Sequence, residues 1–201
     1  MQLSNSLILL TGAYGSIGSY IYRQFSPLCE VIRLQRTNND LYSLPHLYSD
    51  KNVILLHFAS STPANNNSSN HLINEIQLNN IINSLNLINI IPHVIFASSM
   101  SVYDKLCRPK IISESSLITT NDEYGLSKFN CERLLESATY CGSIKGHLSL
   151  RLPGVLAPNS AEASGNFISV LIEKLKSNNP VNLFNPNGDF NNIISVESIS
   201  S

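Results

Sequence analysis

The sequence predicts an α/β fold, a doubly wound parallel sheet with helices on both faces. Two observations carry this prediction. Short apolar runs alternate with longer amphipathic segments along the 201 residues, and the first apolar run leads directly into a glycine-rich turn. Alternation at this spacing is typical of βαβ units, in which right-handed helical crossovers join consecutive parallel strands.

Each apolar run predicts a buried strand, and each amphipathic segment predicts a helix. The predicted strands span residues 7–10, 31–34, 53–58, 94–97 and 147–152. The predicted helices span residues 17–25, 71–90, 121–138 and 167–175. We expect Pro92 to end the second helix. Thr120 and Glu123 predict a capping box for the third, because each can satisfy a free backbone amide of the other.

Composition and charge exclude several classes of partner. The net charge is −1 and no basic cluster is present, so we expect no nucleic-acid partner. The longest apolar runs, such as residues 53–56, are too short to span a bilayer, so we expect no membrane partner. No Lys or Arg precedes the first apolar run, which argues against a secretory signal and favours a cytoplasmic protein.

The cysteines and histidines do not predict a metal site. Cys29, Cys107, Cys131 and Cys141 form no C-x-x-C pair, and the five histidines are scattered singly. A structural zinc site needs closely spaced ligand pairs. We therefore expect reduced thiols and no metal.

The glycine-rich turn, residues 11–18, lies between the first strand and the first helix. Gly12 lets the chain turn off the strand, Gly15 lets a pyrophosphate approach the backbone, and Gly18 lets the helix pack closely on the sheet. The free amides and positive dipole end of the helix favour phosphate there. This pattern favours a Rossmann-type site for NAD or NADP, and the alternative is a glycine-rich turn without a ligand.

The tip of the second strand bears on the choice of cofactor. NAD-binding folds usually place an acidic residue there for the adenine ribose hydroxyls. Residues 34–37 contain no carboxylate. Arg36 offers paired, charge-assisted hydrogen bonds to a 2′-phosphate, which favours NADP over NAD. The alternative is a solvated surface arginine.

Tyr124 and Lys128 are four residues apart on one face of the predicted third helix. A phenol normally loses its proton near pH ~10, and a neighbouring ammonium favours the phenolate. We therefore expect Lys128 to lower the pKa of Tyr124, which would suit acid/base catalysis. Upstream, Ser98, Ser99 and Ser101 follow a central strand, at the sheet edge where ligands bind in open α/β folds.

The order of these motifs resembles the extended short-chain dehydrogenase/reductases, the NAD-dependent epimerase/dehydratase family. The likeness extends over nearly the whole chain. It includes the glycine turn, the S-S-x-x-V-Y segment ending at Tyr103, and Y-G-x-S-K at 124–128. It also includes H-F-A-S at 57–60, Asn79 in the next helix, and the R-L-P-G-V-L-A-P segment at 151–158.

The resemblance implies a role for each site residue. Ser99 would hydrogen-bond the sugar, Tyr124 would be the acid/base, and Lys128 would hold the nicotinamide ribose. Asn166 would meet the diphosphate of a nucleotide sugar. The implied cofactor-binding residues are Gly12, Gly15, Ser16, Ile17, Gly18, Arg36, Ala59, Ser60, Lys128 and Pro153.

The resemblance also implies the organisation of the chain. Residues 1–152 are the expected NAD(P)-binding Rossmann domain, and residues 153–201 the start of a small substrate-binding lobe. We expect either a fragment or a trimmed family member. The short stretch between Arg36 and Val53 predicts that the usual helix–strand unit there is shortened or missing.

The implied function is an NAD(P)-dependent nucleotide-sugar epimerase or keto-sugar reductase, in cell-surface polysaccharide biosynthesis. Met100 and Ser101 stand where the family's dehydratases carry an acidic pair, so elimination of water is disfavoured. The alternative is a non-catalytic dinucleotide-binding protein, a sensor or an inactive member of the fold. The positions of helices 71–90 and 121–138 match the family's dimer interface, so we expect a homodimer.

Overall fold

A five-stranded parallel sheet forms the centre of the molecule, in the order β2-β1-β3-β4-β5. The computed structural model describes residues 5–35, 51–62, 72–103, 111–156, 167–181 and 192–200. The strands are β1 (Ser6–Thr11), β2 (Glu30–Leu34), β3 (Asn52–His57), β4 (His93–Ser99) and β5 (Gly146–Leu152). This order confirms the predicted doubly wound α/β fold.

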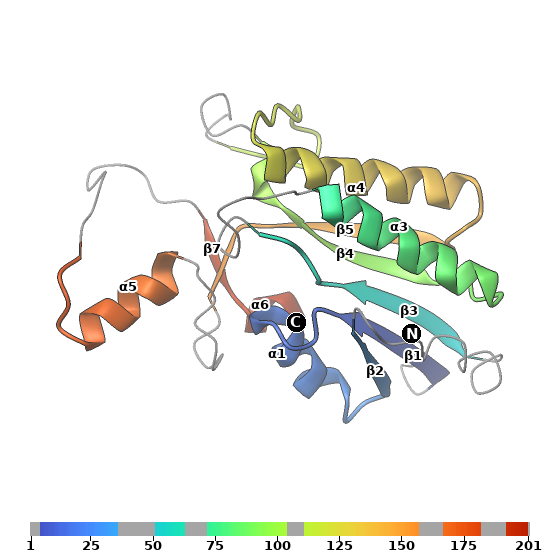
Figure 1. Ribbon diagram of the computed structural model, residues 1–201, viewed down its shortest axis with the longest axis horizontal. Helices are drawn as coiled ribbons and strands as arrows, with labels where there is room; N and C mark the ends of the chain where they lie inside the picture. The colour runs from blue at the N-terminus through green and yellow to red at the C-terminus, as the bar shows by residue number, and fades with distance from the viewer. Residues whose placement is uncertain are drawn as a thin grey trace.

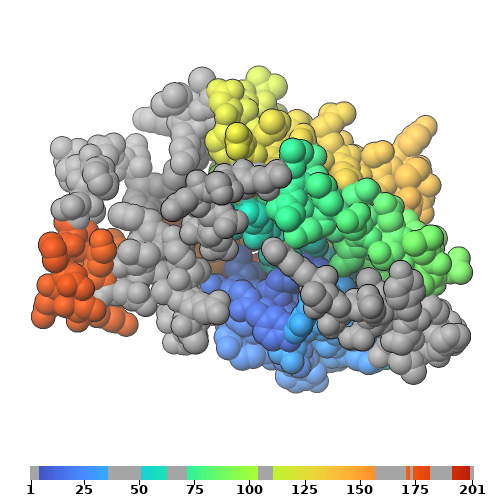
Figure 2. Space-filling view, in the orientation of Figure 1, coloured from blue at the N-terminus to red at the C-terminus, as the bar shows by residue number. Residues whose placement is uncertain are grey.

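Helices cover both faces of the sheet (Figure 1). On one face lie α1 (Ser16–Phe25) and the short α6 (Glu197–Ser200). On the other face lie α3 (Leu72–Leu87) and α4 (Glu123–Tyr140), side by side. Figure 2 shows the same division on the surface, with α1 and the first strands in the lower part and α3 and α4 in the upper part.

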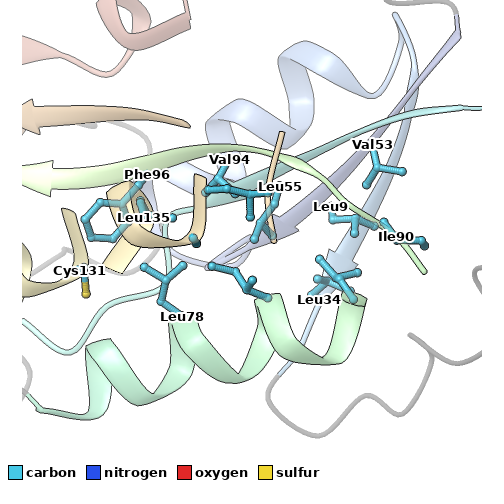
Figure 3. Packing of buried hydrophobic residues seen from close by; sticks show 14 of the residues in the cluster. Leu9, Leu34, Val53, Leu55, Leu78, Ile90, Val94, Phe96, Cys131 and Leu135 are labelled. Carbon is cyan, nitrogen blue, oxygen red and sulfur yellow. The ribbon is translucent and has the colours of Figure 1, made fainter. Parts of the chain in front are cut away.

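The alternation of side chains along the strands builds two apolar cores. Leu7 and Leu9 of β1 are fully buried toward α3 and α4, whereas Ile8 and Leu10 face α1. Figure 3 shows the core under α3 and α4, where side chains from both helices and the sheet converge. Because successive strand residues point to opposite faces, the sequence of a strand buried on both sides is a continuous run of apolar residues. That is why these strands were predictable.

Two helix ends differ from the prediction. The helix after β3 ends at Leu87, because Asn89 has a φ of 61° and Ile90 N donates to the Leu85 carbonyl at 2.9 Å. Asn tolerates this left-handed conformation, which ends the helix before Pro92 is reached. At α4 the N-cap is Asp122, whose side chain accepts a hydrogen bond from Gly125 N at 2.9 Å. The prediction of a capping box formed by Thr120 and Glu123 is therefore wrong.

Residues after β5 form a second, two-stranded parallel sheet of β6 (Gly154–Leu156) and β7 (Ile193–Ser195). Helix α5 (Phe167–Lys176) lies between them in sequence and beyond β7 in space (Figure 1). The chain then returns to the first sheet, where Ile199 of α6 packs against the core on the α1 side. None of the helices in the described part of the chain has the length and apolarity needed to cross a membrane.

The strand order creates a switch point at the carboxyl ends of β1 and β3. Strand β1 pairs with β2 on one side and with β3 on the other. The chain therefore leaves β1 in one direction and β3 in the opposite direction, which opens a crevice at this edge of the sheet. β3 pairs directly with β1. Residues 36–50, for which a shortened or missing helix–strand unit was predicted, lie outside the described part.

Candidate functional site

The glycine turn after β1 is shaped by contact with the end of β3. Gly12 has a φ of 67°, and a Cβ there would lie 2.6 Å from Ala59 N and 2.7 Å from the Phe58 carbonyl carbon. A Cβ on Gly18 would collide with the Gly12 carbonyl oxygen. These two glycines are therefore required by the protein itself, for the turn and for close packing of α1.

Gly15 has a different explanation. Its φ of −78° suits any residue, and among the described residues a Cβ there would meet only the Gly12 carbonyl oxygen, at 3.4 Å. Gly15 is also the N-cap of α1 and makes no side-chain cap bond, so the first amides of the helix lack a side-chain partner at the cap. An exposed backbone with uncapped amides at a positive helix end fits a pyrophosphate. The turn thus fits a dinucleotide cofactor.

A buried polar chain joins this turn to β3. Thr11 Oγ1 lies 3.0 Å from Nδ1 of His57 and accepts a hydrogen bond from Ala59 N at 3.2 Å. Burial lowers the pKa of His57 to about 3, and the positive charge of Lys128 adds to the effect. A neutral imidazole at this position holds the two strand ends together without placing a charge in the core.

Tyr124 lies where the three elements of the site meet. Its side chain forms hydrogen bonds with Ser60, which follows β3, and with Ser99, the last residue of β4. Ser99 Oγ also accepts from Ser101 N at 3.1 Å, which fixes its rotamer. The structure therefore brings Ser99 and Tyr124 together as predicted, and it adds Ser60 as a second hydroxyl beside the phenol.

Lys128 is fully buried one turn further along α4. Its Nζ donates to the Ala97 carbonyl at 2.8 Å and lies 5.7 Å from the centroid of the Tyr124 ring. Burial lowers the pKa of Lys128 to about 8, because an ammonium loses its hydration there. The lysine thus lies against the face of the tyrosine ring.

The pKa of Tyr124 departs from the prediction. We expected Lys128 to lower it, but burial raises it, and the hydrogen bonds with Ser60 and Ser99 only partly oppose this. The ammonium of Lys128 lies over the ring, 5.7 Å from its centroid, and is not among the groups that shift the pKa of Tyr124. In this structure Tyr124 is a neutral phenol near pH 7, able to donate a proton.

Asn74 is a site residue that the sequence analysis missed. It is buried on α3, accepts from Ser61 N at 2.7 Å and donates to Ser127 Oγ at 3.2 Å. Ser60 Oγ lies 3.4 Å from the same Asn74 oxygen. Asn79, expected from the resemblance, is exposed. The sequence places Asn74 on the apolar face of the helix, in line with Leu78. A buried amide must have hydrogen-bond partners, so this position could have indicated a polar contact in the core.

A second polar network supports the site from β5. Arg151 donates to both carboxylate oxygens of Glu132, with Nη2 2.7 Å from Oε2, and its Nη1 donates to the Tyr103 hydroxyl. Ser98 Oγ donates to Glu132 Oε1 at 2.5 Å. The hydrogen bonds with Glu132 and Tyr103 raise the pKa of Arg151. The network ties α4 to β4 and β5 directly behind Ser99 and Lys128.

The remaining predicted residues lie in different places. Ser16 opens α1, and the side chain of Ile17 packs into the core, so only its backbone faces the turn. Pro153 follows Leu152, the strand partner of Ser99. Arg36 and Asn166 lie outside the described residues. Within the described part of the chain, no three His, Cys, Asp or Glu side chains gather as metal ligands would.

Comparison with known proteins agrees with this geometry. A model of the NAD dependent epimerase/dehydratase family matches residues 8–191. No curated protein sequence matches the chain.

Solved structures resemble the chain in fold. A UDP-N-acetylglucosamine 4-epimerase from Methanobrevibacter ruminantium, in complex with UDP-N-acetylmuramic acid, has a TM-score of 0.79 and 19% identity, over 98% of this chain and 71% of that one. The Thermotoga maritima UDP-glucose 4-epimerase with UDP-glucose has a TM-score of 0.79 and 16% identity, over 96% and 70%. The Thermus thermophilus UDP-glucose 4-epimerase complex with NAD has a TM-score of 0.78 and 15% identity, over 96% and 72%.

At these identities the likeness of the solved structures establishes the fold alone. The family model covers most of the chain, including the glycine turn, Ser99, Tyr124 and Lys128. The chain therefore belongs to the NAD dependent epimerase/dehydratase family.

Proposed function

We propose that the chain binds NAD or NADP at the β1/β3 crevice and catalyses hydride transfer on a nucleotide-activated sugar, as an epimerase or keto-sugar reductase. The observation that carries this proposal is the hydroxyl group of Tyr124, held by Ser60 and Ser99 at the carboxyl edge of the sheet. When bound, the nicotinamide ring accepts or supplies the hydride. The likeness to epimerases in complex with nucleotide sugars or NAD supports the choice of ligands.

The chain's own residues transfer the proton and position the substrate and the cofactor. Tyr124 gives or takes the proton of the sugar oxygen, and Ser99 orients that oxygen by a hydrogen bond. The raised pKa of Tyr124 suits proton donation, as in reduction of a ketone. Lys128 lies next to both the Tyr124 ring and the Ala97 carbonyl, where it would hold the nicotinamide ribose.

The remaining expectations extend this proposal. NADP is the favoured cofactor, because the tip of β2 carries no carboxylate. Ala59, Ser60 and Pro153 line the cofactor side of the crevice, the glycine turn holds the pyrophosphate, and Asn166 contacts the diphosphate of the sugar nucleotide. We propose a cytoplasmic location and a role in cell-surface polysaccharide biosynthesis.

The test compares Tyr124→Phe with the unmodified chain in sugar-nucleotide turnover and in cofactor binding. The substitution keeps the ring but deletes the oxygen that exchanges the proton. Acid–base groups contribute roughly 10²–10⁴-fold in rate, so turnover should fall by about that much. Cofactor affinity, measured by fluorescence titration, should hardly change, because the glycine turn supplies most of it.

Tyr140→Phe is the matched control, because Tyr140 lies at the end of the same helix and is 96% exposed. It should keep full activity. Full turnover by Tyr124→Phe with any sugar nucleotide would remove Tyr124 from the mechanism. Tight cofactor binding by the unmodified chain without turnover of any nucleotide sugar would instead favour the non-catalytic alternative.

A further inference from the structure

A second serine hydroxyl, besides that of Ser99, lies beside the phenol of Tyr124. Ser60 follows the last residue of β3, His57, by three positions, and its side chain forms a hydrogen bond with that of Tyr124. From the sequence we expected only a cofactor contact for Ser60. The contact with the phenol places Ser60 next to the oxygen that exchanges the proton in the proposed reaction.

Ser60 is held in this position by Asn74 of α3. Its Oγ lies 3.4 Å from Asn74 Oδ1 and 3.3 Å from the Ser61 carbonyl oxygen. Asn74 is only 2% exposed, and it is bound to both backbone groups of Ser61. Ser61 N donates to Oδ1 at 2.7 Å, and Nδ2 donates to the Ser61 carbonyl at 3.2 Å. A buried amide thus fixes the segment that carries the Ser60 hydroxyl.

The Ser60 hydroxyl has acceptors on two sides. It carries a single proton, which can rotate toward different acceptors while the oxygen stays in place. While Tyr124 is a neutral phenol, it can donate to Ser60, whose own proton then points to Asn74 Oδ1 or to the Ser61 carbonyl. Once Tyr124 has lost its proton, Ser60 can turn its proton to the phenolate. Both arrangements use the same positions of the heavier atoms.

The other polar groups near the phenol are used elsewhere. Ser99 also has a single proton, and in the proposed reaction that proton goes to the sugar oxygen. Lys128 donates to a backbone carbonyl and is not among the groups that shift the pKa of Tyr124. Among the described side chains, Ser60 is therefore the hydroxyl that remains for the phenolate when a sugar is bound.

We propose that Ser60 is a catalytic residue, which donates a hydrogen bond to the Tyr124 oxygen as its proton passes to the substrate. The inference rests on the proposed reaction. In reduction, the keto carbon receives the hydride of the reduced nicotinamide and the keto oxygen receives the Tyr124 proton. The Tyr124 O–H bond breaks, and its electron pair stays on the phenolate oxygen. Ser60 stabilises that charge, and in the reverse direction the same hydrogen bond keeps the phenolate ready to accept a proton.

The first experiment follows the ionisation of Tyr124 without any substrate. A chain labelled with 3-fluorotyrosine gives a fluorine NMR signal for each tyrosine, and the Tyr124 signal is the one that Tyr124→Phe lacks. Fluorine also lowers the ordinary pKa of a phenol, which brings the titration closer to neutral pH. Ser60→Ala should move the titration of Tyr124 to higher pH, because the phenolate loses a donor. Ser60→Thr keeps the hydroxyl and should titrate like the unmodified chain.

Ser127→Ala is the matched control. Ser127 Oγ accepts from the same Asn74 amide at 3.2 Å, but it donates to the backbone carbonyl of Tyr124, at 2.9 Å. The variant disturbs the same network and should leave the titration of the phenol unchanged. Asp122 and Cys131, which raise the pKa of Tyr124, are present in every variant, so their effects cancel in the comparison.

The second experiment measures turnover of UDP-glucose and UDP-N-acetylglucosamine. A hydrogen bond to a charged group predicts that Ser60→Ala lowers kcat by roughly 10- to 100-fold. KM should hardly change, because the charge on the phenolate develops only in the transition state.

Three results would overturn the assignment. They are an unchanged Tyr124 titration in Ser60→Ala, an equal shift in Ser127→Ala, and a shifted titration with full turnover. If the titration shifts but the unmodified chain turns over neither sugar, the proposed reaction fails for these sugars. Ser60 then keeps its contact with the phenol and loses its catalytic role.

Discussion

At Gly125 the start of α4 passes very close to the turn after β4. A Cβ there would collide with the Ser101 carbonyl oxygen and with Thr120 Oγ1. The glycine lies next to Tyr124, so any shift that relieves the collision also moves the phenol. The glycine of the Y-G-x-S-K motif is thus explained by packing rather than by ligand contact.

Gly125→Ala should destabilise the fold, because an added methyl group in a tightly packed site typically costs about 1–3 kcal/mol. Urea denaturation followed by circular dichroism would measure the loss. Gly146→Ala is the control, because a Cβ there would lie 3.7 Å from Nδ1 of His93, an ordinary contact. Equal stability of the two variants would show that the α4 turn relaxes freely.

Lys128 predicts a dependence of stability on pH. Its pKa falls to about 8 in the folded chain because of burial, whereas the unfolded value is the ordinary 10.5. Between these values the unfolded chain binds more protons, so stability rises with pH. The free energy of unfolding of the unmodified chain, minus that of Lys128→Met, should therefore increase from pH 7 toward pH 10. A difference that stays flat over this range would contradict the buried, depressed lysine.

At the scale of single residues, motif order identified Ser99, Tyr124 and Lys128 as neighbours, since their elements and faces follow from periodicity. The sequence could not predict whether the pKa of Tyr124 is raised or lowered, because this depends on how deeply the ring is buried. Asn74 was missed for a related reason. Its partners, Ser61 and Ser127, come from two other segments and meet only in the folded chain.

At the scale of elements, α4 is attached to the sheet by one ion pair as well as by its apolar face. The side chains of Glu132 and Arg151 are 6% and 22% exposed, so the pair is largely removed from water. Glu132 also accepts from Ser98, the neighbour of Ser99. The pair therefore sets the position of α4 relative to the end of β4.

Glu132→Gln should lower the free energy of unfolding by roughly 3 kcal/mol, because it leaves the Arg151 guanidinium buried without its countercharge. Denaturant titration of the variant would measure this. The double variant Glu132→Gln, Arg151→Met should recover part of the loss, since no unpaired charge remains. Glu30→Gln, which breaks the exposed pair with Lys51, should cost less than about 1 kcal/mol. If Glu132→Gln lowered the free energy of unfolding no more than Glu30→Gln does, the buried pair would contribute little to stability.

The elements themselves were largely predictable, and their ends less so. Continuous apolar runs located β1 and β3 because both faces of the sheet are covered by helices. The ends of α3 and α4 depend on single residues, Asn89 and Asp122, that compete with nearby alternatives. Pro92 and Thr120 fitted the general rules equally well, and only the local backbone geometry distinguishes them.

At the scale of the whole molecule, α3 and α4 present apolar side chains to solvent. The exposed residues on these helices include Leu72, Ile73, Ile76 and Leu126. Asn130 of α4 donates to Glu75 of α3 at 3.0 Å, so the two helices form one continuous surface. A second copy of the chain is the occupant that the family resemblance predicts for this face.

Light scattering should therefore give the mass of a homodimer at micromolar concentration, and Ile76→Asp should give a monomer. Ile76 is 55% exposed, and a carboxylate buried there would lose its hydration on association. Leu87→Asp, at the carboxyl end of α3 and 76% exposed, is the matched control that should remain dimeric. A monomeric mass for the unmodified chain would contradict the homodimer.

The return of α6 to the face of α1 has a consequence for how the chain matures during synthesis. Helix α1 leaves the ribosome well before Ile199, which packs against the same face of the sheet. Among the described residues, the core of the opposite face, under α3 and α4, is complete once Ile144 has emerged. The two sides of one sheet are therefore finished at different times. Until the later one closes, Ile21 and its neighbours remain incompletely covered, and a nascent chain exposing apolar surface is prone to associate with chaperones or with itself.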